Sequence, residues 1–173
     1  STKKCIVLDL DNTLWGGVVG EDGFDKIKLG DDPIGKSFVE FQKRLLALNQ
    51  RGIILAINSK NNFDDAIKVI NEHPNMILRK ENFSSIKINW NDKVSNLREI
   101  AKELNIGIDS LVFFDDDQMN REFVRNQLSD VLVVDLPTDS SIYPKILTEM
   151  NVFESIKITD EDLKRRNMYS QQQ

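Results

Sequence analysis

Acidic and hydroxyl side chains follow three apolar runs of the sequence, at the point where each run ends. The first run is followed by Asp9 and Asp11, the second by Ser59, and the third by Asp115 and Asp116. In a parallel α/β sheet, ligands bind beyond the carboxyl ends of the strands, so the residues that end each strand share one crevice. We therefore expect these five side chains to meet at one edge of a sheet.

Carboxylates that converge in this way repel one another. Two unit charges about 4 Å apart cost roughly 4 kcal/mol at an effective dielectric constant near 20, so a cation must compensate. The chain has one cysteine and one histidine. A hard, oxygen-liganded ion such as Mg²⁺ therefore fits better than zinc or copper. Lys93 adds a positive charge, and its place at the start of an expected helix runs against the macrodipole preference, which indicates a functional reason for it.

The spacing of the first two acids indicates the chemistry. Asp9 and Asp11 lie two residues apart, so they project to the same side if the backbone stays extended. One carboxylate could then bind the metal and attack, while the other moves protons. A carboxylate that attacks a phosphoryl group needs its charge neutralised, and Mg²⁺, Lys93, the Ser59 hydroxyl and backbone N–H groups could do this.

The elements that must position these residues alternate between short apolar strands and amphipathic helices. We expect strands at residues 5–8, 53–57, 111–114 and 131–134, with a further candidate at 76–78. Helical spacing of apolar residues covers 38–48, 63–70 and 94–104. Near-continuous apolar strands need helices on both faces, so we predict an α/β fold with a central parallel sheet.

A chain of 173 residues predicts one domain, which we place at residues 1–158. Five of the eight glycines lie between Gly16 and Gly30, and we interpret residues 15–32 as a mobile flap. Residues 159–173 are mostly charged and predict a polar helix or tail. Because the chain lacks an initiator Met and ends abruptly in three glutamines, we expect either processing or a fragment of a larger protein.

Composition excludes several classes of function. The net charge of −5, from 23 Lys+Arg and 28 Asp+Glu, opposes binding to nucleic acid or to an anionic membrane. No apolar run approaches the roughly 18 residues that a membrane span needs. The start of the chain does not resemble a secretory leader, and one cysteine cannot form an internal disulfide. We expect a cytoplasmic protein, and we interpret Cys5 as a buried structural residue rather than a thioester acceptor.

The motifs resemble those of a known superfamily. Asp9-Leu10-Asp11-Asn12-Thr13-Leu14, then Ser59, Lys93 and Asp115-Asp116 in that order are similar to the four motifs of the haloacid dehalogenase phosphohydrolases. The resemblance implies a Rossmann-like core in which Asp9 forms an aspartyl-phosphate and Asp11 acts as general acid and base. Ser59 and Lys93 would bind phosphoryl oxygens. Asp9, the Asp11 carbonyl and the pair Asp115 and Asp116 would hold Mg²⁺; strand alignment favours Asp116 as the direct ligand without settling the choice.

A narrower resemblance points to the FkbH-like branch, subfamily IIIC of that superfamily. It rests on residues 15–23, Ser59-Lys60-Asn61, His73-Pro74, Asn89-Trp90 and, near the end, Glu161-Asp162 with Arg165 and Tyr169. Such domains take a glyceryl group from 1,3-bisphosphoglycerate, release phosphate and load an acyl carrier protein for polyketide biosynthesis. The resemblance therefore implies a phosphorylated small molecule and a carrier protein as partners. The branch continues its acidic pair with Asn-Pro, whereas this chain has Asp117-Gln118, a departure that concerns substrate contacts rather than the metal site.

Too few residues separate Thr13 from Ser59, or Ser59 from Lys93, to hold an inserted cap domain. We expect a capless, open site that a large partner completes. Lys60 and Asn61 follow Ser59 closely enough to contact substrate, although a solvated or capping role is an equal alternative, and Trp15 could form a wall of the site.

Two other functions fit parts of the pattern. One is a plain capless phosphatase that acts on another phosphorylated substrate. The other is a non-enzymatic phosphoacceptor receiver module, which also sets an acidic pair, a hydroxyl and a lysine around an aspartate. The acids that end the first strand of such a module are adjacent, so the separated Asp9 and Asp11 favour an enzyme.

Overall fold

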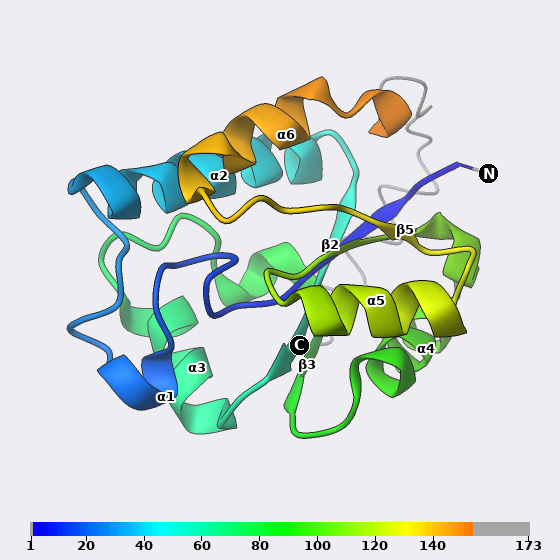
Figure 1. The fold of residues 1–173 in the computed structure, drawn as a ribbon, viewed down its shortest axis with the longest axis horizontal. Coiled ribbons are helices and arrows are strands. Elements are labelled where there is room, and N and C mark those ends of the chain that lie inside the picture. The colour runs from blue at the N-terminus through cyan, green and yellow to red at the C-terminus, as the bar shows by residue number, and fades with distance from the viewer. Residues whose placement is uncertain (1, 154–173) are drawn as a thin grey trace.

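The structure is a computed structural model that describes residues 2–153. Its centre is a parallel sheet of five strands in the order β3-β2-β1-β4-β5 (Figure 1). The strands are β1 (Cys5–Leu8), β2 (Ile54–Lys60), β3 (Phe83–Asn89), β4 (Leu111–Phe114) and β5 (Leu132–Val133). The predicted α/β fold with a central parallel sheet is confirmed.

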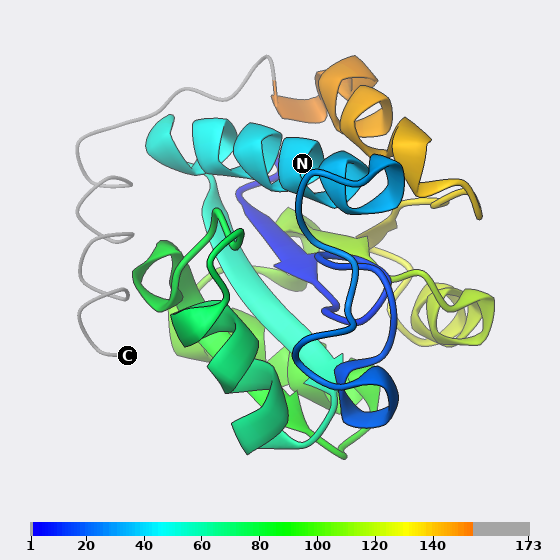
Figure 2. The same cartoon turned by 90° about the vertical axis from the view of Figure 1, so that its left-hand side faces the viewer.

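Helices cover both faces of this sheet. They are α1 (Val19–Asp22), α2 (Pro33–Gln50), α3 (Phe63–Glu72), α4 (Lys93–Leu104), α5 (Gln118–Gln127) and α6 (Tyr143–Glu149), with single 3₁₀ turns at Lys80–Asn82, Ile108–Ser110, Ser140–Ile142 and Asn151–Phe153. Apolar residues of α2, α3 and α6 pack on one face, and those of α4 and α5 pack on the other. α6 lies beside α2 (Figure 2).

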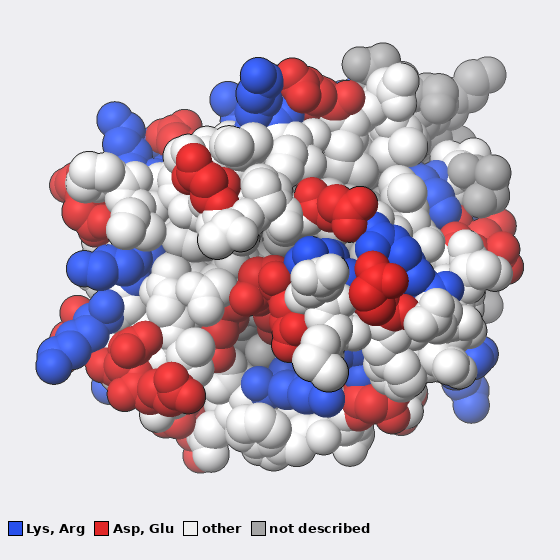
Figure 3. All heavy atoms as spheres, in the orientation of Figure 1, with Lys and Arg blue, Asp and Glu red and all other residues white. Residues whose placement is uncertain are grey.

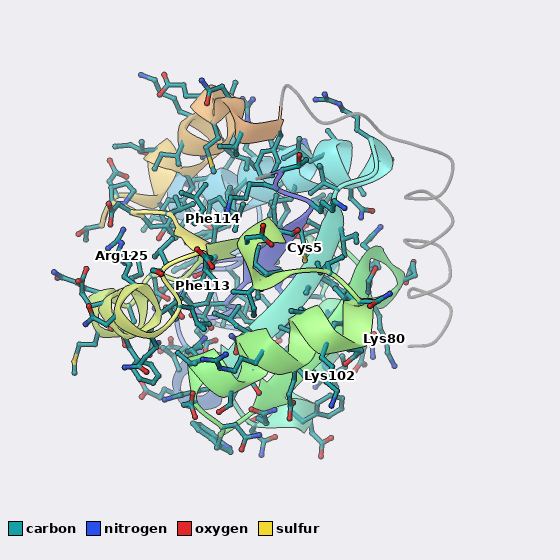
Figure 4. The ribbon with its side chains drawn as sticks, turned by 90° about the vertical axis from the view of Figure 1, so that its right-hand side faces the viewer. Cys5, Lys80, Lys102, Phe113, Phe114 and Arg125 are labelled. Atoms are coloured by element: carbon teal, nitrogen blue, oxygen red, sulfur yellow. The ribbon has the colours of Figure 1, made fainter. Side chains whose placement is uncertain are left out.

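Alternation along the strands explains why the apolar runs are continuous. On β1, Ile6 and Leu8 join the core under α2, while Cys5 joins the core under α4, and all three are fully buried. On β4, Phe113 and Phe114 extend toward opposite faces (Figure 4). Both faces of these strands are therefore buried, as in other parallel sheets with helices on each side. Burial also raises the pKa of the Cys5 thiol, so Cys5 is poorly suited to nucleophilic chemistry.

One predicted strand is wrong. Residues 76–78 are buried at Met76 and Leu78 but form no strand, because the N–H groups of Ile77 and Leu78 donate to the side chain of Gln42 instead of to a neighbouring strand. The strand lies at Phe83–Asn89. Ser84, Ser85 and Lys87 interrupt its apolar pattern, and this hid it in the sequence.

Residues 15–32, interpreted as a flap, pack against the core. Gly16 and Lys28 pair as an isolated antiparallel bridge, and the segment includes the short helix α1. Val19, Ile27 and Leu29 are buried. No cap domain is inserted between the strands of the described part of the chain, where α1, α2, α3 and one 3₁₀ turn fill the intervals from β1 to β3. Among residues 2–153, no helix is both long and apolar enough to cross a bilayer. The predicted polar tail at 159–173 lies outside the described residues.

Candidate active site

Three carboxylates meet at the carboxyl ends of β1 and β4. These strands pair in register, with Leu8 opposite Phe114, so the residues that follow them emerge at the same level of the sheet edge. Asp9, Asp115 and Asp116 each offer a carboxylate oxygen, and these oxygens lie within 4.8 Å of one another. Asp115 is fully buried. The strand ends thus assemble a group of acids that could hold a metal ion.

A buried lysine holds two of these carboxylates. The Lys93 ammonium lies 3.2 Å from Asp9 Oδ1 and 3.0 Å from Asp115 Oδ2, and donates to the Asn58 carbonyl at 2.6 Å. Only 1% of the lysine is exposed. Burial acts to lower the pKa of Lys93, but the charges of Asp9 and Asp115 outweigh it and the pKa is raised overall. Lys93 therefore remains a cation at neutral pH.

One lysine does not neutralise three acids. Burial, followed by the charge of Asp9, raises the pKa of Asp115 to about 6 and the pKa of Asp116 to about 8. These shifts mean that the acids resist ionisation together. A divalent cation removes this repulsion, and a donor set made only of carboxylate oxygens suits Mg²⁺. The residues present therefore fit that metal.

The carboxylate of Asp11 is held by its own hydrogen bonds, which come from residues other than Lys93. Its Oδ1 accepts from Trp15 Nε1 and from the Val19 N–H, both at 2.9 Å, and its Oδ2 accepts from Asn61 Nδ2 at 2.8 Å. Burial raises the pKa of Asp11, although the hydrogen bonds from Val19 and Trp15 act in the opposite direction. A carboxyl group with a raised pKa in a fixed orientation is suited to proton transfer.

Trp15 does not form a wall of the site, contrary to the prediction from the sequence. The side chain is fully buried in the core, and its indole N–H binds Asp11. Asn61 is also buried and donates to Asp11, a bond that the sequence analysis did not anticipate. Both residues therefore orient the carboxyl group of Asp11.

A cavity of about 270 Å³ opens beside these groups. It is lined by Asp9, Asp11, Asn12, Val18, Lys60, Lys93, Asp116, Asp117 and Asn120. Ser59, 1% exposed, ends the buried part of β2 next to Lys60, and its hydroxyl lies 3.5 Å from Asn61 Nδ2. Acidic atoms gather near the middle of the face that carries α5 (Figure 3). Asp9, Asp11, Lys60, Lys93 and Asp116, all predicted from the sequence, thus line one cavity, and the buried Asp115 lies behind it.

A network of asparagines lies beside Lys93 and was not predicted from the sequence. Asn58 Nδ2 donates to the Lys93 carbonyl at 3.0 Å, and Asn96 Nδ2 donates to Asn58 Oδ1 at 3.0 Å and to Asn89 Oδ1 at 2.9 Å. Asn58 and Asn96 are fully buried. The only signal in the sequence is the three-residue spacing of Lys93 and Asn96, which puts both on one side of α4. The network fixes the start of α4 and with it the lysine.

Comparisons with known proteins support the same fold. No family model and no curated protein matches the chain. The N-terminal part of the protein BF1531 from Bacteroides fragilis, a crystal structure that contains a phosphatase domain complexed with Mg, is 44% identical with a TM-score of 0.87. The match covers 91% of this chain and 42% of that one, so this chain spans less than half of its neighbour. An uncharacterised protein from Corynebacterium glutamicum, 12% identical over 90% of this chain and 98% of its own with a TM-score of 0.54, shares the fold alone.

Proposed function

We propose that the protein is a Mg²⁺-dependent phosphohydrolase of the haloacid dehalogenase type that works through an aspartyl-phosphate at Asp9. The observation that carries this proposal is the group of three carboxylates beside a buried lysine, with Asp11 oriented separately two residues beyond Asp9. The similarity to a phosphatase domain complexed with Mg supports the metal and the reaction class.

The metal would be held by the carboxylates of Asp9 and Asp116 and by the backbone carbonyl of Asp11. Asp116 is the better direct ligand because it lines the cavity. Asp115 instead pairs with Lys93 and accepts hydrogen bonds from the Asp117 N–H at 2.9 Å and from Asn120. When bound, Mg²⁺ neutralises the acids and the phosphoryl oxygens so that the two can approach.

The reaction has two steps. A carboxylate oxygen of Asp9 attacks phosphorus, the bond from phosphorus to the leaving oxygen breaks, and Asp11 gives its proton to that oxygen. Asp11 then takes a proton from water, whose oxygen attacks phosphorus and breaks the bond to Asp9. Phosphate leaves, and both acids return to their starting state.

The remaining polar residues bind the phosphoryl group. Lys93 lines the cavity from below and holds Asp9, so it is placed to neutralise charge that develops during transfer. Lys60 is exposed and lines the same cavity. Ser59 precedes Lys60 in the sequence and would donate its hydroxyl hydrogen to a phosphoryl oxygen.

The finer form of the proposal is glyceryl transfer. The FkbH-like motifs of the sequence support 1,3-bisphosphoglycerate as substrate and an acyl carrier protein as acceptor of the glyceryl group, with phosphate released. The absence of a cap between the strands of the described residues leaves the site open to such a partner. The proposal of glyceryl transfer also supports a cytoplasmic location.

The test has two parts. With Mg²⁺, the protein should release phosphate from a small acyl phosphate such as acetyl phosphate, and both EDTA and Asp9→Asn should abolish the release. Beryllofluoride should add to Asp9 and nowhere else; an adduct elsewhere contradicts the mechanism. A phosphoprotein that persists for hours without phosphate release would indicate the receiver function.

The second part uses 1,3-bisphosphoglycerate and carrier protein. A glyceryl adduct on the carrier supports transfer, and phosphate without an adduct indicates plain hydrolysis.

A further inference from the structure

A second and larger cavity adjoins the acidic site. Its volume is about 680 Å³, and it shares Asn12 and Asp116 with the smaller cavity around Asp9. Its walls come from the turn at Gly16 and Gly17, the starts of α2, α5 and α6, and the loop that follows β5. A group attached to phosphorus at Asp9 can therefore extend into this space past Asn12.

Asn12, which lines both cavities, is held in a defined conformation. Asn12 adopts a left-handed backbone with φ 58°, its Oδ1 accepts from the Gly17 N–H at 2.8 Å, and its carbonyl accepts from the Tyr143 hydroxyl at 3.1 Å. A Cβ at Gly16 would lie 2.9 Å from Lys28 Cβ, closer than such atoms approach, and 3.0 Å from Phe38 Cε2, a tight contact. Glycine at position 16 therefore lets the turn pack closely against Lys28 and Phe38 in the cavity wall.

The lining combines an apolar surface with charged groups of both signs, because Arg121 and Asp139 line it together with Lys28 and Asp116. Ile34, Phe38, Leu136 and Pro137 provide the apolar part. Lys28 lines the same cavity, and among residues 2–153 no carboxylate forms an ion pair with its ammonium group. Arg121 instead lies 3.9 Å from Asp135, so the exposed Lys28 is the cation of this lining that lacks an ion pair among the described residues.

We infer that this cavity binds the leaving group of the substrate, and that it selects a phosphorylated compound whose leaving group has an apolar body and an anionic end paired with Lys28, a preference that favours the plain phosphatase over 1,3-bisphosphoglycerate, whose leaving group is polar throughout. The inference rests on the proposed function, because it takes the phosphoryl group to lie at Asp9. Sites for small molecules well above the size of phosphate have volumes of roughly 300–1,000 Å³, and the volume of this cavity lies within that range. An anion suits the cavity because an unpaired ammonium gains a charge-assisted hydrogen bond when it meets one.

Two phosphonates that are not hydrolysed test this inference without turnover. Benzylphosphonate and 4-carboxybenzylphosphonate differ by one carboxylate, and their Kd values are measured by calorimetry with Mg²⁺ present. Because Lys28 is exposed, we expect the carboxylated compound to bind about twofold to fivefold more tightly to the unmodified protein. Lys28→Met should reduce this ratio to about one, whereas Lys26→Met should keep it, because Lys26 is exposed like Lys28 but does not line the cavity.

The outcomes separate the inference from the proposed function. Equal affinity for the two phosphonates, or a ratio that Lys28→Met leaves unchanged, overturns the inference even if phosphate release is normal. A ratio that depends on Lys28, together with no Mg²⁺-dependent phosphate release from acetyl phosphate or from any phosphate ester, overturns the proposed function and leaves the binding site in place. Thermal unfolding of both variants verifies that they are folded, and Lys28→Gln provides a second neutral variant with the same expectation.

Discussion

Replacing Lys93 by methionine measures how strongly one buried cation holds the acidic site together. The ammonium lies 3.2 Å from Asp9 and 3.0 Å from Asp115, and each contact corresponds to about 5 kcal/mol of Coulomb energy at an effective dielectric constant of 20. Much of this energy offsets the removal of the charges from water. Breaking a buried pair by removing one partner costs about 3–5 kcal/mol, so we expect the free energy of unfolding of Lys93→Met to fall by that amount at pH 9 without metal.

The pH dependence of this loss distinguishes lost charge from lost packing. At pH 5, Asp115 and Asp116 are largely protonated because their pKa values are raised to about 6 and about 8. Only the pair of Lys93 with Asp9 then remains, and the loss should fall to about 2 kcal/mol. The sign follows from linkage: fewer ionised carboxylates at low pH leave less repulsion for the lysine to offset.

Urea unfolding at pH 5 and pH 9, with EDTA present, gives the two free energies. Lys87→Met is a matched control, because Lys87 forms a more exposed ion pair with Glu103 at 2.6 Å and should cost less than about 1 kcal/mol. The reasoning is refuted if Lys93→Met loses no more than the control, or if it loses the same amount at both pH values. Adding Asp115→Asn to Lys93→Met should restore part of the stability at pH 9.

Three further results are expected. Folding raises the pKa of Asp115 to about 6 and that of Asp116 to about 8, so their contribution to stability is present at low pH and lost as pH rises through these values. Thermal unfolding in EDTA should show this decline in stability. Mg²⁺ or Asp116→Asn should make the decline smaller. Asp11→Asn should slow phosphate release by about 10²–10⁴-fold while beryllofluoride still adds to Asp9, and loss of that adduct would contradict a proton-transfer role. Trp15→Phe removes a hydrogen bond that lowers the pKa of Asp11, so the pH–rate profile should move to higher pH, and an unchanged profile would show that the indole does not tune this acid.

The position of the acidic site follows from the amino-acid sequence. The apolar runs at 5–8 and 111–114 are the strands observed, and the acids that end them must meet because neighbouring parallel strands finish at the same edge. The spacing of Asp9 and Asp11 and the place of Lys93 at the first turn of α4 were equally readable, because they depend on local geometry. Strand β3 was not predicted from the sequence because Ser84 and Ser85 interrupt its apolar pattern.

The hydrogen-bond partner of each polar group depends instead on how distant segments pack. Asn61 reaches Asp11 across 50 residues of sequence, and Asn58 binds Lys93 across 35, through contacts that depend on strand register and side-chain rotamers. The same holds for Trp15, which turned into the core to bind Asp11 because an indole buries a large apolar ring and still satisfies its N–H. Periodicity along a chain specifies which face a residue takes, whereas its hydrogen-bond partner depends on where distant segments pack.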